Sequence, residues 1–207
     1  ETMTIVEEAL TEVNREIVQE IMTLGASAIS LSGKDEPLIV AAKHPEINGV
    51  DIGFVGAAKR VNSEIIGKMA TSDIIPVISP IGIGKDGYAY NINADTAAAE
   101  IARALKALKF VLLTDTDGIL MNPKDPSTLI AHMGAAQVEE YITSGVITGG
   151  MIPKVRACLK ALDRGVKKAH IINGKTPHAL LLEIFTDHGI GSEIVKKSIL
   201  GTVGGQG

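Results

Sequence analysis

A glycine pair followed by a proline and a lysine stands in the string Val146-Ile147-Thr148-Gly149-Gly150-Met151-Ile152-Pro153-Lys154. Helical spacing begins directly after the glycines, so Pro153 falls in a first turn, where its missing N–H does no harm. Backbone N–H groups at a helix start bind phosphate oxygens, and a lysine one turn in adds a point charge. The string therefore predicts a phosphate-facing helix start with Lys154 as its cation, and the alternative is an ordinary capped helix with a solvated lysine.

An apolar run that ends in an acidic loop, residues 112–119, is a second candidate. In open parallel sheets, ligands bind beyond the carboxyl ends of the strands. Asp115 and Asp117 stand in that position, directly after the apolar run. The alternative is a simple turn at the strand exit, in which Gly118 supplies a positive φ.

Two amides and a carboxylate alternate in the string Tyr90-Asn91-Ile92-Asn93-Ala94-Asp95, just before a helix-like pattern. In an extended segment, alternate residues point to the same side, so Asn91, Asn93 and Asp95 are expected to face one ligand together. The alternative is that Asp95 caps the following helix and the asparagines satisfy a turn.

Two further glycine patterns are weaker. Residues 82–87 match G-x-G-x-x-G formally, but no helix can begin inside these glycines, so we expect a turn or hairpin loop rather than a dinucleotide site. The string Gly174-Lys175-Thr176 resembles the end of a P-loop, but Ala169 stands where that pattern requires glycine. We expect this string to be a turn between a strand and a helix.

The elements that position these residues follow from hydrophobic spacing and from glycine and proline punctuation. Helices are predicted over residues 1–24, 63–69, 95–106, 135–143, 151–162 and 178–185, with Gly25 ending the first and Ser63 capping the second. Strands are predicted over residues 27–32, 38–43, 51–62, 74–79, 110–114 and 169–172. Strands that alternate with helices in this way indicate an α/β fold with a mainly parallel sheet.

The composition of the chain argues against several classes of protein. Hydrophobic residues make up 45% of the 207 residues and aromatic residues only 3%, so the core is built from aliphatic side chains, as in buried parallel sheets. The net charge of −4 without a basic stripe argues against nucleic-acid binding. The single cysteine, Cys158, excludes an internal disulfide and favours a reducing compartment. No apolar run reaches the length of a membrane span, and the start at Glu1 suggests a truncated chain.

Taken together, the three candidate strings resemble the acetylglutamate kinases of the amino-acid kinase family. The resemblance extends over nearly the whole chain, and its most specific parts are Asn91-Ile92-Asn93-Ala94-Asp95 and Thr148–Lys154. It implies an α/β fold, a three-layer α/β/α sandwich around an open, mainly parallel sheet. It also implies an acyl-amino-acid-binding lobe over residues 1–92, a nucleotide-binding lobe over residues 93–200 and a flexible tail over residues 201–207.

The resemblance further implies an activity and its partners. The expected reaction is phosphorylation of the side-chain carboxylate of N-acetyl-L-glutamate by ATP in arginine biosynthesis, in a cytoplasmic homo-oligomer without membrane or nucleic-acid partners. Mg²⁺ is expected to arrive with the nucleotide, without a metal site made by the protein alone. Arginine is a candidate inhibitor.

The resemblance implies a role for each residue that stands at a matching position of the family's motifs. Asn91 and Asn93 would hold the acylated amino acid, Asp95 would orient the catalytic lysines, and Lys154 would stabilise the phosphoryl group in transfer. The nucleotide would be contacted by Asp115, Thr116, Asp117, Gly118, Ile119, Leu120, Val146, Ile147, Thr148 and Gly149. An arginine effector would be contacted by His170, Glu183 and Gly191, with the Glu183 carboxylate as a bidentate partner of the guanidinium group.

The departure from the family lies at the N-terminus. Members begin with a strand and a glycine-rich loop that carries another catalytic lysine, followed by a second glycine loop and a substrate-gripping arginine, and none of these precedes Glu1. This chain alone is therefore expected to be incomplete for catalysis. The alternatives are a non-catalytic module that binds a nucleotide or an effector, and a kinase for another acidic amino acid. The amides of Asn91 and Asn93 argue against the latter, because they suit an acylated amino acid.

Overall fold

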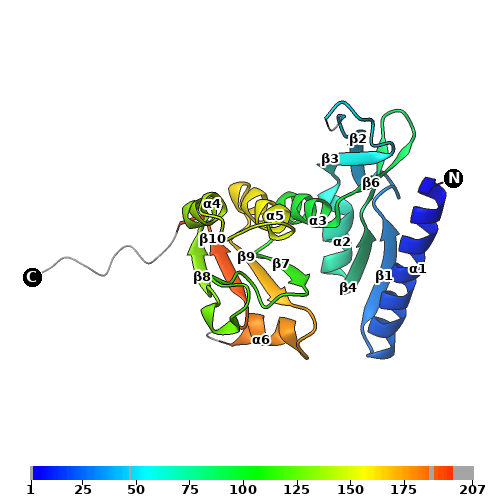
Figure 1. Cartoon of the computed structure of the whole chain (residues 1–207). Helices are drawn as coiled ribbons and strands as arrows, with labels where there is room; N and C mark the ends of the chain where they lie inside the picture. The colour runs from blue at the N-terminus through cyan, green and yellow to red at the C-terminus, as the bar shows by residue number, and fades with distance from the viewer. Residues whose placement is uncertain (1, 47, 187–188, 198–207) are drawn as a thin grey trace, which may run out of the picture. The chain divides into compact units, whose positions relative to one another are not determined.

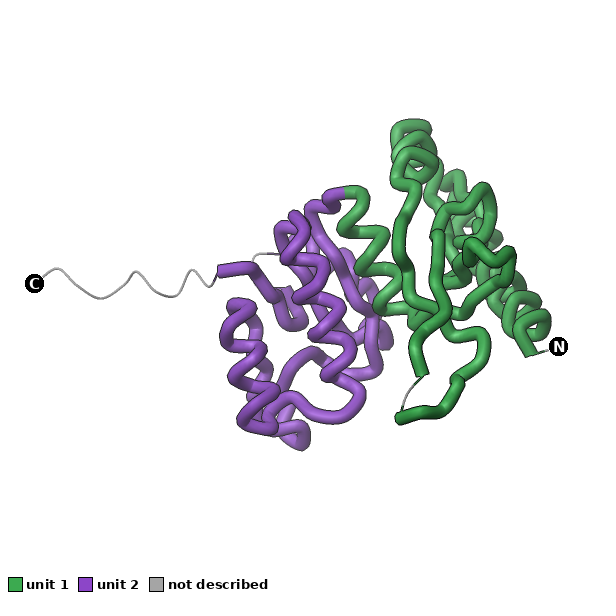
Figure 2. The backbone as a smooth tube through the Cα atoms, turned by 90° about the horizontal axis from the view of Figure 1, so that it is seen from above, with its two compact units in different colours: residues 1–105 green, residues 106–207 purple. Residues whose placement is uncertain are grey.

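The computed structural model describes residues 2–46, 48–186 and 189–197 and divides the chain into two compact units, Glu1–Leu105 and Lys106–Gly207 (Figure 2). The sequence placed the boundary between the lobes after residue 92. In the structure the helix α3 (Ala94–Leu105) groups with the first unit, because it packs against α2 and β3 of that unit. The expected tail, residues 201–207, lies outside the described residues.

The first unit combines a strand pair with a small closed barrel. Strands β1 (Ser27–Ser32) and β4 (Ile74–Ser79) pair in parallel, and the helices α1 (Thr2–Thr23) and α2 (Ser63–Thr71) pack against them (Figure 1). The barrel consists of β2 (Ile39–Lys43), β3 (Val55–Val61), β6 (Ala89–Ile92) and β5 (Ile81–Gly84). Leu38, Ile39, Ile66, Tyr90 and Ile92 form the centre of its hydrophobic core.

The hairpin of β5 and β6 explains the first glycine pattern. The two strands are antiparallel, and Gly87, with a φ of +80°, lies in the turn that joins them. The turn is closed by a hydrogen bond from the Gly84 N–H to the Tyr88 carbonyl at 2.8 Å. The prediction of a hairpin loop is therefore confirmed.

The second unit is a four-stranded sheet covered on both faces. Its elements are β7 (Lys109–Thr114), η1 (Pro126–Thr128), β8 (His132–Gly134), α4 (Ala135–Thr143), α5 (Met151–Asp163), β9 (Lys168–Asn173), α6 (Ala179–Phe185) and β10 (Ser192–Val195). The strand order is β7-β9-β10-β8, with β9 and β10 antiparallel and the two outer pairs parallel. Figure 1 shows α4 and α5 on one face of this sheet and α6 on the other.

The α/β class is confirmed, and the pairings are mainly parallel. Among the described residues, five strand pairs are parallel and three are antiparallel. The closed barrel was not expected, because two of its strands, β5 and β6, have only four residues each and show no clear alternation. Among the described residues, no helix is long and apolar enough to cross a membrane.

Of the helix ends and turns predicted from glycine and serine positions, some are confirmed and one is wrong. The end of α1 near Gly25, with a φ of +88°, was predicted correctly, as was the turn at Gly174 between β9 and α6. The prediction that Ser63 caps α2 is wrong. The capping position belongs to Asn62, whose side chain makes no capping hydrogen bond.

Candidate functional site

A cavity of about 370 Å³ opens in the second unit, between the loop after β7 and the start of α5. Both segments were predicted from sequence to bind a nucleotide, and the fold brings them together. The cavity is lined by Asp115, Thr116, Gly118, Ile119, Leu120, Pro123, Val146, Ile147, Thr148, Gly150, Met151 and Lys154. Pro123, Gly150 and Met151 were missed, although the last two belong to the glycine string already singled out.

The loop after β7 turns sharply at the end of the strand. Thr114 lies at the strand end, and its hydroxyl oxygen accepts a hydrogen bond from the Thr116 N–H at 3.1 Å. Gly118 follows with a φ of +139°, a conformation that favours glycine. The apolar side chain of Ile119 is buried and forms part of the cavity wall.

Asp117 belongs to this loop but does not line the cavity. Its carboxylate accepts a hydrogen bond from the side-chain amide of Asn173, at the end of β9, with an N–O distance of 2.7 Å. The amide oxygen of Asn173 in turn accepts a hydrogen bond from the Lys175 N–H at 2.9 Å. Asp117 therefore ties the loop to the neighbouring strand. Gly149 is likewise absent from the lining, although its neighbours contribute to it.

The start of α5 is built largely as predicted. The helix begins at Met151, Gly150 precedes it without any side-chain cap, and the half-buried Lys154 lines the cavity from the first turn. The N–H groups of Met151 and Ile152 donate to the carbonyls of Thr148 and Gly149, both at 3.2 Å. These two N–H groups are therefore already paired with the backbone. The prediction that the helix start faces a phosphate stays a prediction, as does the alternative of an ordinary helix with a solvated lysine.

The amide string lies in the first unit. Asn91 is in β6, and its backbone N–H donates to the Phe54 carbonyl at 2.9 Å. The extended segment ends at Ile92, so the expected alternation does not continue to Asp95, which is in the first turn of α3. Asn93 caps this helix instead of Asp95, because its side-chain oxygen accepts a hydrogen bond from the Thr96 N–H at 3.1 Å.

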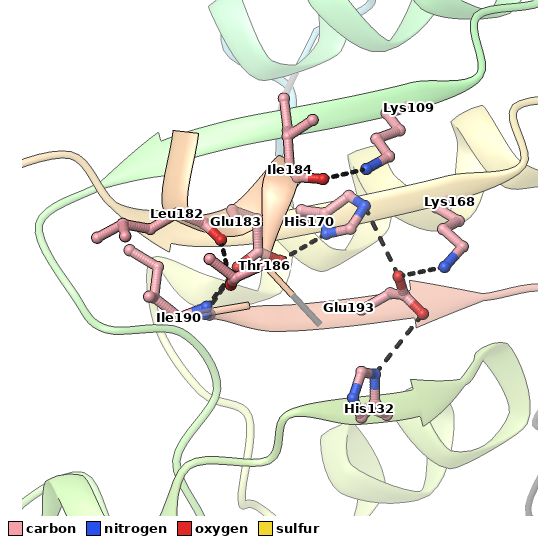
Figure 3. Close-up of polar contacts among 11 residues, drawn as sticks. Lys109, His132, Lys168, His170, Leu182, Glu183, Ile184, Thr186, Ile190 and Glu193 are labelled. Atoms are coloured by element: carbon pink, nitrogen blue, oxygen red, sulfur yellow. Dashed lines mark hydrogen bonds and ion pairs between the residues drawn. The ribbon is translucent and has the colours of Figure 1, made fainter. Parts of the chain in front are cut away.

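The three residues proposed for an effector, His170, Glu183 and Gly191, meet in a second cavity of about 210 Å³ in the second unit. His170 comes from β9 and Glu183 from α6, and their side chains, which point toward each other in Figure 3, are each only 3% exposed. The His170 Nδ1 lies 2.6 Å from the Glu183 Oε1. The Glu183 Oε2 accepts hydrogen bonds from the N–H groups of Ile190, at 2.7 Å, and Gly191, at 3.0 Å.

The Glu183 carboxylate is thus already satisfied by the protein itself. The expectation that it grips a guanidinium group bidentately is not supported by this geometry, because both oxygens have partners. The Nε2 of His170 is buried and has no hydrogen-bond partner among the described residues, although the Glu193 Oε2 lies 3.9 Å away.

Glu193 borders the same cavity from β10 and was not predicted from sequence. Its carboxylate lies 2.7 Å from the Lys168 Nζ and 3.6 Å from the His132 Nδ1. Burial raises the pKa of Glu193. The hydrogen bond and the charge of Lys168, with smaller contributions from the two histidines, together lower this pKa by more than burial raises it. The pKa of Glu193 therefore lies below its ordinary value.

Among the described residues, no group of three or more histidine, cysteine, aspartate or glutamate side chains is arranged to hold a metal ion. The first cavity, which Lys154 lines, contains one carboxylate, that of Asp115. Mg²⁺ is commonly held by one or two carboxylates together with substrate phosphates, so this lining suits a metal that comes with a nucleotide.

The sequence matches the family described as "Amino acid kinase family" over residues 1–173. The chain is 53% identical over 197 residues to the acetylglutamate kinase of Thermoanaerobacter sp. (strain X514), an alignment that covers 95% of this chain. The chain spans 65% of the length of that relative.

Solved structures agree with this assignment of the fold. The structure of smu.665 from Streptococcus mutans UA159 matches with a TM-score of 0.76 and 28% identity, over 94% of this chain and 72% of that one. N-acetylglutamate synthase from Neisseria gonorrhoeae, complexed with coenzyme A and L-arginine, matches with a TM-score of 0.73 and 26% identity. That match covers 84% of this chain and 38% of the synthase chain.

Proposed function

The chain belongs to the amino acid kinase family, and on that premise we propose that it forms the larger part of an acetylglutamate kinase. The reaction would transfer the γ-phosphoryl group of ATP to the side-chain carboxylate of N-acetyl-L-glutamate. One observation carries this proposal. Two strings, residues 115–120 and 146–154, were expected from the sequence and its resemblance to line a nucleotide site, and they line one cavity that contains Lys154.

The cavity suits the donor side of this reaction. Its volume of about 370 Å³ lies within the usual range of small-molecule sites. Phosphoryl transfer needs positioning and charge neutralisation more than covalent chemistry. Lys154 would neutralise charge on the phosphoryl group as it moves, and Asp115 would contact the Mg²⁺ that the nucleotide brings. Ile119, Ile147 and Met151 add apolar surface to the cavity wall, which suits a base.

The acceptor side is proposed to use the string 91–95 of the first unit. The Asn93 oxygen is occupied by Thr96, whose N–H and hydroxyl both lie within hydrogen-bond distance, at 3.1 and 3.2 Å. What Asn93 can still offer a ligand is therefore the two N–H donors of its amide. Such donors suit the carboxylate and acyl oxygens of an N-acyl amino acid. Asp95 is proposed to orient catalytic lysines by charge.

Arginine is proposed as an inhibitor that binds the cavity of His170 and Glu193. The solved synthase complex that resembles this chain contains L-arginine. In this chain His170 and Glu193 both line that cavity, and the His170 Nε2 has no hydrogen-bond partner among the described residues. A carboxylate accepts hydrogen bonds from a guanidinium group, so Glu193 would make the main contact. Arginine-dependent inhibition of the complete enzyme, lost in Glu193→Gln, would support this assignment.

The test of the proposed function has two stages. Titration calorimetry of this chain with MgATP is expected to show binding, and a Lys154→Ala variant is expected to bind more weakly. An enzyme completed at its N-terminus is then assayed for ADP release with N-acetyl-L-glutamate, aspartate, glutamate and a carrier-bound aminoadipate. Activity confined to N-acetyl-L-glutamate supports the proposal, whereas a preference for another acceptor would reassign the substrate. MgATP binding without acceptor-dependent ADP release would instead favour a non-catalytic module.

A further inference from the structure

Ser192 is a buried serine of β10 that contacts the nucleotide-facing loop from behind. Its side chain is 0% exposed, and its hydroxyl oxygen accepts a hydrogen bond from the Ile119 N–H at 2.8 Å. The two residues are 73 positions apart in the sequence. Ile119 lines the cavity, whereas Ser192 does not. Ser192 therefore contacts the backbone of the loop and not the interior of the cavity.

Gly118 makes this contact possible. A Cβ atom at residue 118 would lie 2.7 Å from the Ser192 Oγ and 3.1 Å from the Ser192 backbone nitrogen. The φ of +139° at Gly118 is also one that residues with a side chain rarely adopt. The loop at Gly118 thus lies so close to β10 that only glycine fits there. This close approach brings the Ile119 N–H within hydrogen-bond distance of the Ser192 hydroxyl.

Ser192 is itself held firmly in place. It pairs with Ile171 of β9, in the middle strands of the four-stranded sheet. The two residues before it, Ile190 and Gly191, donate their N–H groups to the Glu183 carboxylate. A Cβ atom at Gly191 would collide with the Ile171 carbonyl, so this approach to the strand also depends on glycine. The Ser192 hydroxyl is therefore a well-fixed hydrogen-bond acceptor for the backbone of the loop 115–120.

We propose that Ser192 is a positioning residue that holds the loop 115–120 in its nucleotide-binding conformation. The proposal rests on the proposed function of the cavity. A second hydrogen bond, from Asn173 to Asp117, holds the loop just before Gly118 in the sequence, whereas the bond to Ser192 holds it just after. Loss of the Ser192 hydroxyl would leave the buried Ile119 N–H without an acceptor, and the segment from Gly118 to Leu120 would shift or loosen.

The test measures loop order and nucleotide affinity separately, in this chain. Ser192→Ala removes the acceptor, and Ser192→Thr keeps a hydroxyl at the same position. Val166→Ala is the matched control, since Val166 is 3% exposed, lies in the same unit and does not line the cavity. Hydrogen exchange is followed by mass spectrometry in peptides that cover residues 115–120 and 109–113. MgATP affinity is measured by titration calorimetry.

Ser192→Ala is expected to accelerate exchange in residues 115–120 but not in residues 109–113, and to weaken MgATP binding about tenfold. Val166→Ala is expected to lower the melting temperature without changing MgATP affinity, and Ser192→Thr is expected to recover part of the lost affinity. Unchanged exchange in residues 115–120, or accelerated exchange with unchanged affinity, would overturn the proposal. If the wild-type chain binds no MgATP, the proposed function fails, and the exchange data still decide whether Ser192 orders the loop.

Discussion

The two cavities of the second unit are built in different ways. The cavity at Lys154 is lined almost entirely by two continuous strings, residues 115–120 and 146–154, and Lys154 is its only basic side chain among the described residues. The cavity at His170 is assembled from residues of β7, β8, β9, α6 and β10 and of the loops beside them, and it contains two histidines, two lysines and two glutamates. The first cavity therefore comes from two local segments with few charged side chains, whereas in the second the charged side chains largely pair with one another.

This difference predicts different responses to substitution. Changes at the first cavity are expected to act on ligand binding and turnover. Changes at the second are expected to act first on folding, because its carboxylates have protein partners that substitution would leave buried and unsatisfied.

The largest effect is expected for Lys154→Ala in an N-terminally complete enzyme. Removal of one preorganised group that acts on the transition state lowers turnover by about 10²–10³-fold. Steady-state kinetics should show a much smaller change in the KM for ATP. Lys160→Ala, on the same helix but outside the cavity lining, serves as the control and should stay near wild type. Turnover within a few-fold of wild type for Lys154→Ala would place this lysine outside the chemistry.

Glu183→Ala should be the most damaging change for stability at the second cavity. It leaves the buried His170 ring and the N–H groups of Ile190 and Gly191 without their acceptor, at a cost of about 3 kcal/mol. Urea unfolding measures this loss. Glu139→Ala is the control, because the ion pair of Glu139 with Arg156 is exposed and worth no more than about 0.5 kcal/mol. Equal losses in both variants would contradict the contrast between buried and exposed carboxylates.

Gly118→Ala is expected to lower the free energy of unfolding by about 2 kcal/mol, through strained backbone and the collision with Ser192. Gly165→Ala separates these causes. Gly165 also has a positive φ, +113°, but a Cβ atom there meets no atom within 4 Å. We expect Gly165→Ala to cost about 1 kcal/mol and to leave MgATP affinity unchanged. Similar affinities for MgATP in both variants would show that the close approach of loop and strand has no bearing on the nucleotide.

The smallest effect concerns pH. The folded-state pKa of Glu193 is lowered, so its contribution to stability is fully present above its unfolded pKa of about 4.5 and is lost as the pH falls through the folded pKa. Unfolding of wild type and Glu193→Gln should therefore differ by about 1 kcal/mol near pH 6, with the difference disappearing well below pH 4. A difference that persists at the lowest pH would mean that Glu193 stabilises through hydrogen bonds of its neutral form rather than through its charge.

The sequence alone predicted the helices, the longer strands and the two strings that line the cavity at Lys154. Helical and strand spacing are local properties, so α4, β1 and β4 were predicted with the bounds that the structure shows. The two cavity strings could be found because each is continuous in the sequence, and because a strand exit and a glycine-rich helix start are common places for ligands. The roles of Asn91, Asp95 and Lys154 in the reaction stay predictions.

Tertiary structure decided what depends on partners distant in sequence. The strands β5, β6, β8 and β10 are too short to show a period, and they are stabilised by pairing with neighbours rather than by their own pattern. Asp117 was predicted to contact the nucleotide, whereas in the structure its carboxylate accepts a hydrogen bond from Asn173, 56 positions away. Neither Ser192 nor Glu193 was predicted from the sequence to be a site residue. Their roles arise because adjacent residues of a strand point to opposite faces, one toward the loop at Ile119 and one toward Lys168.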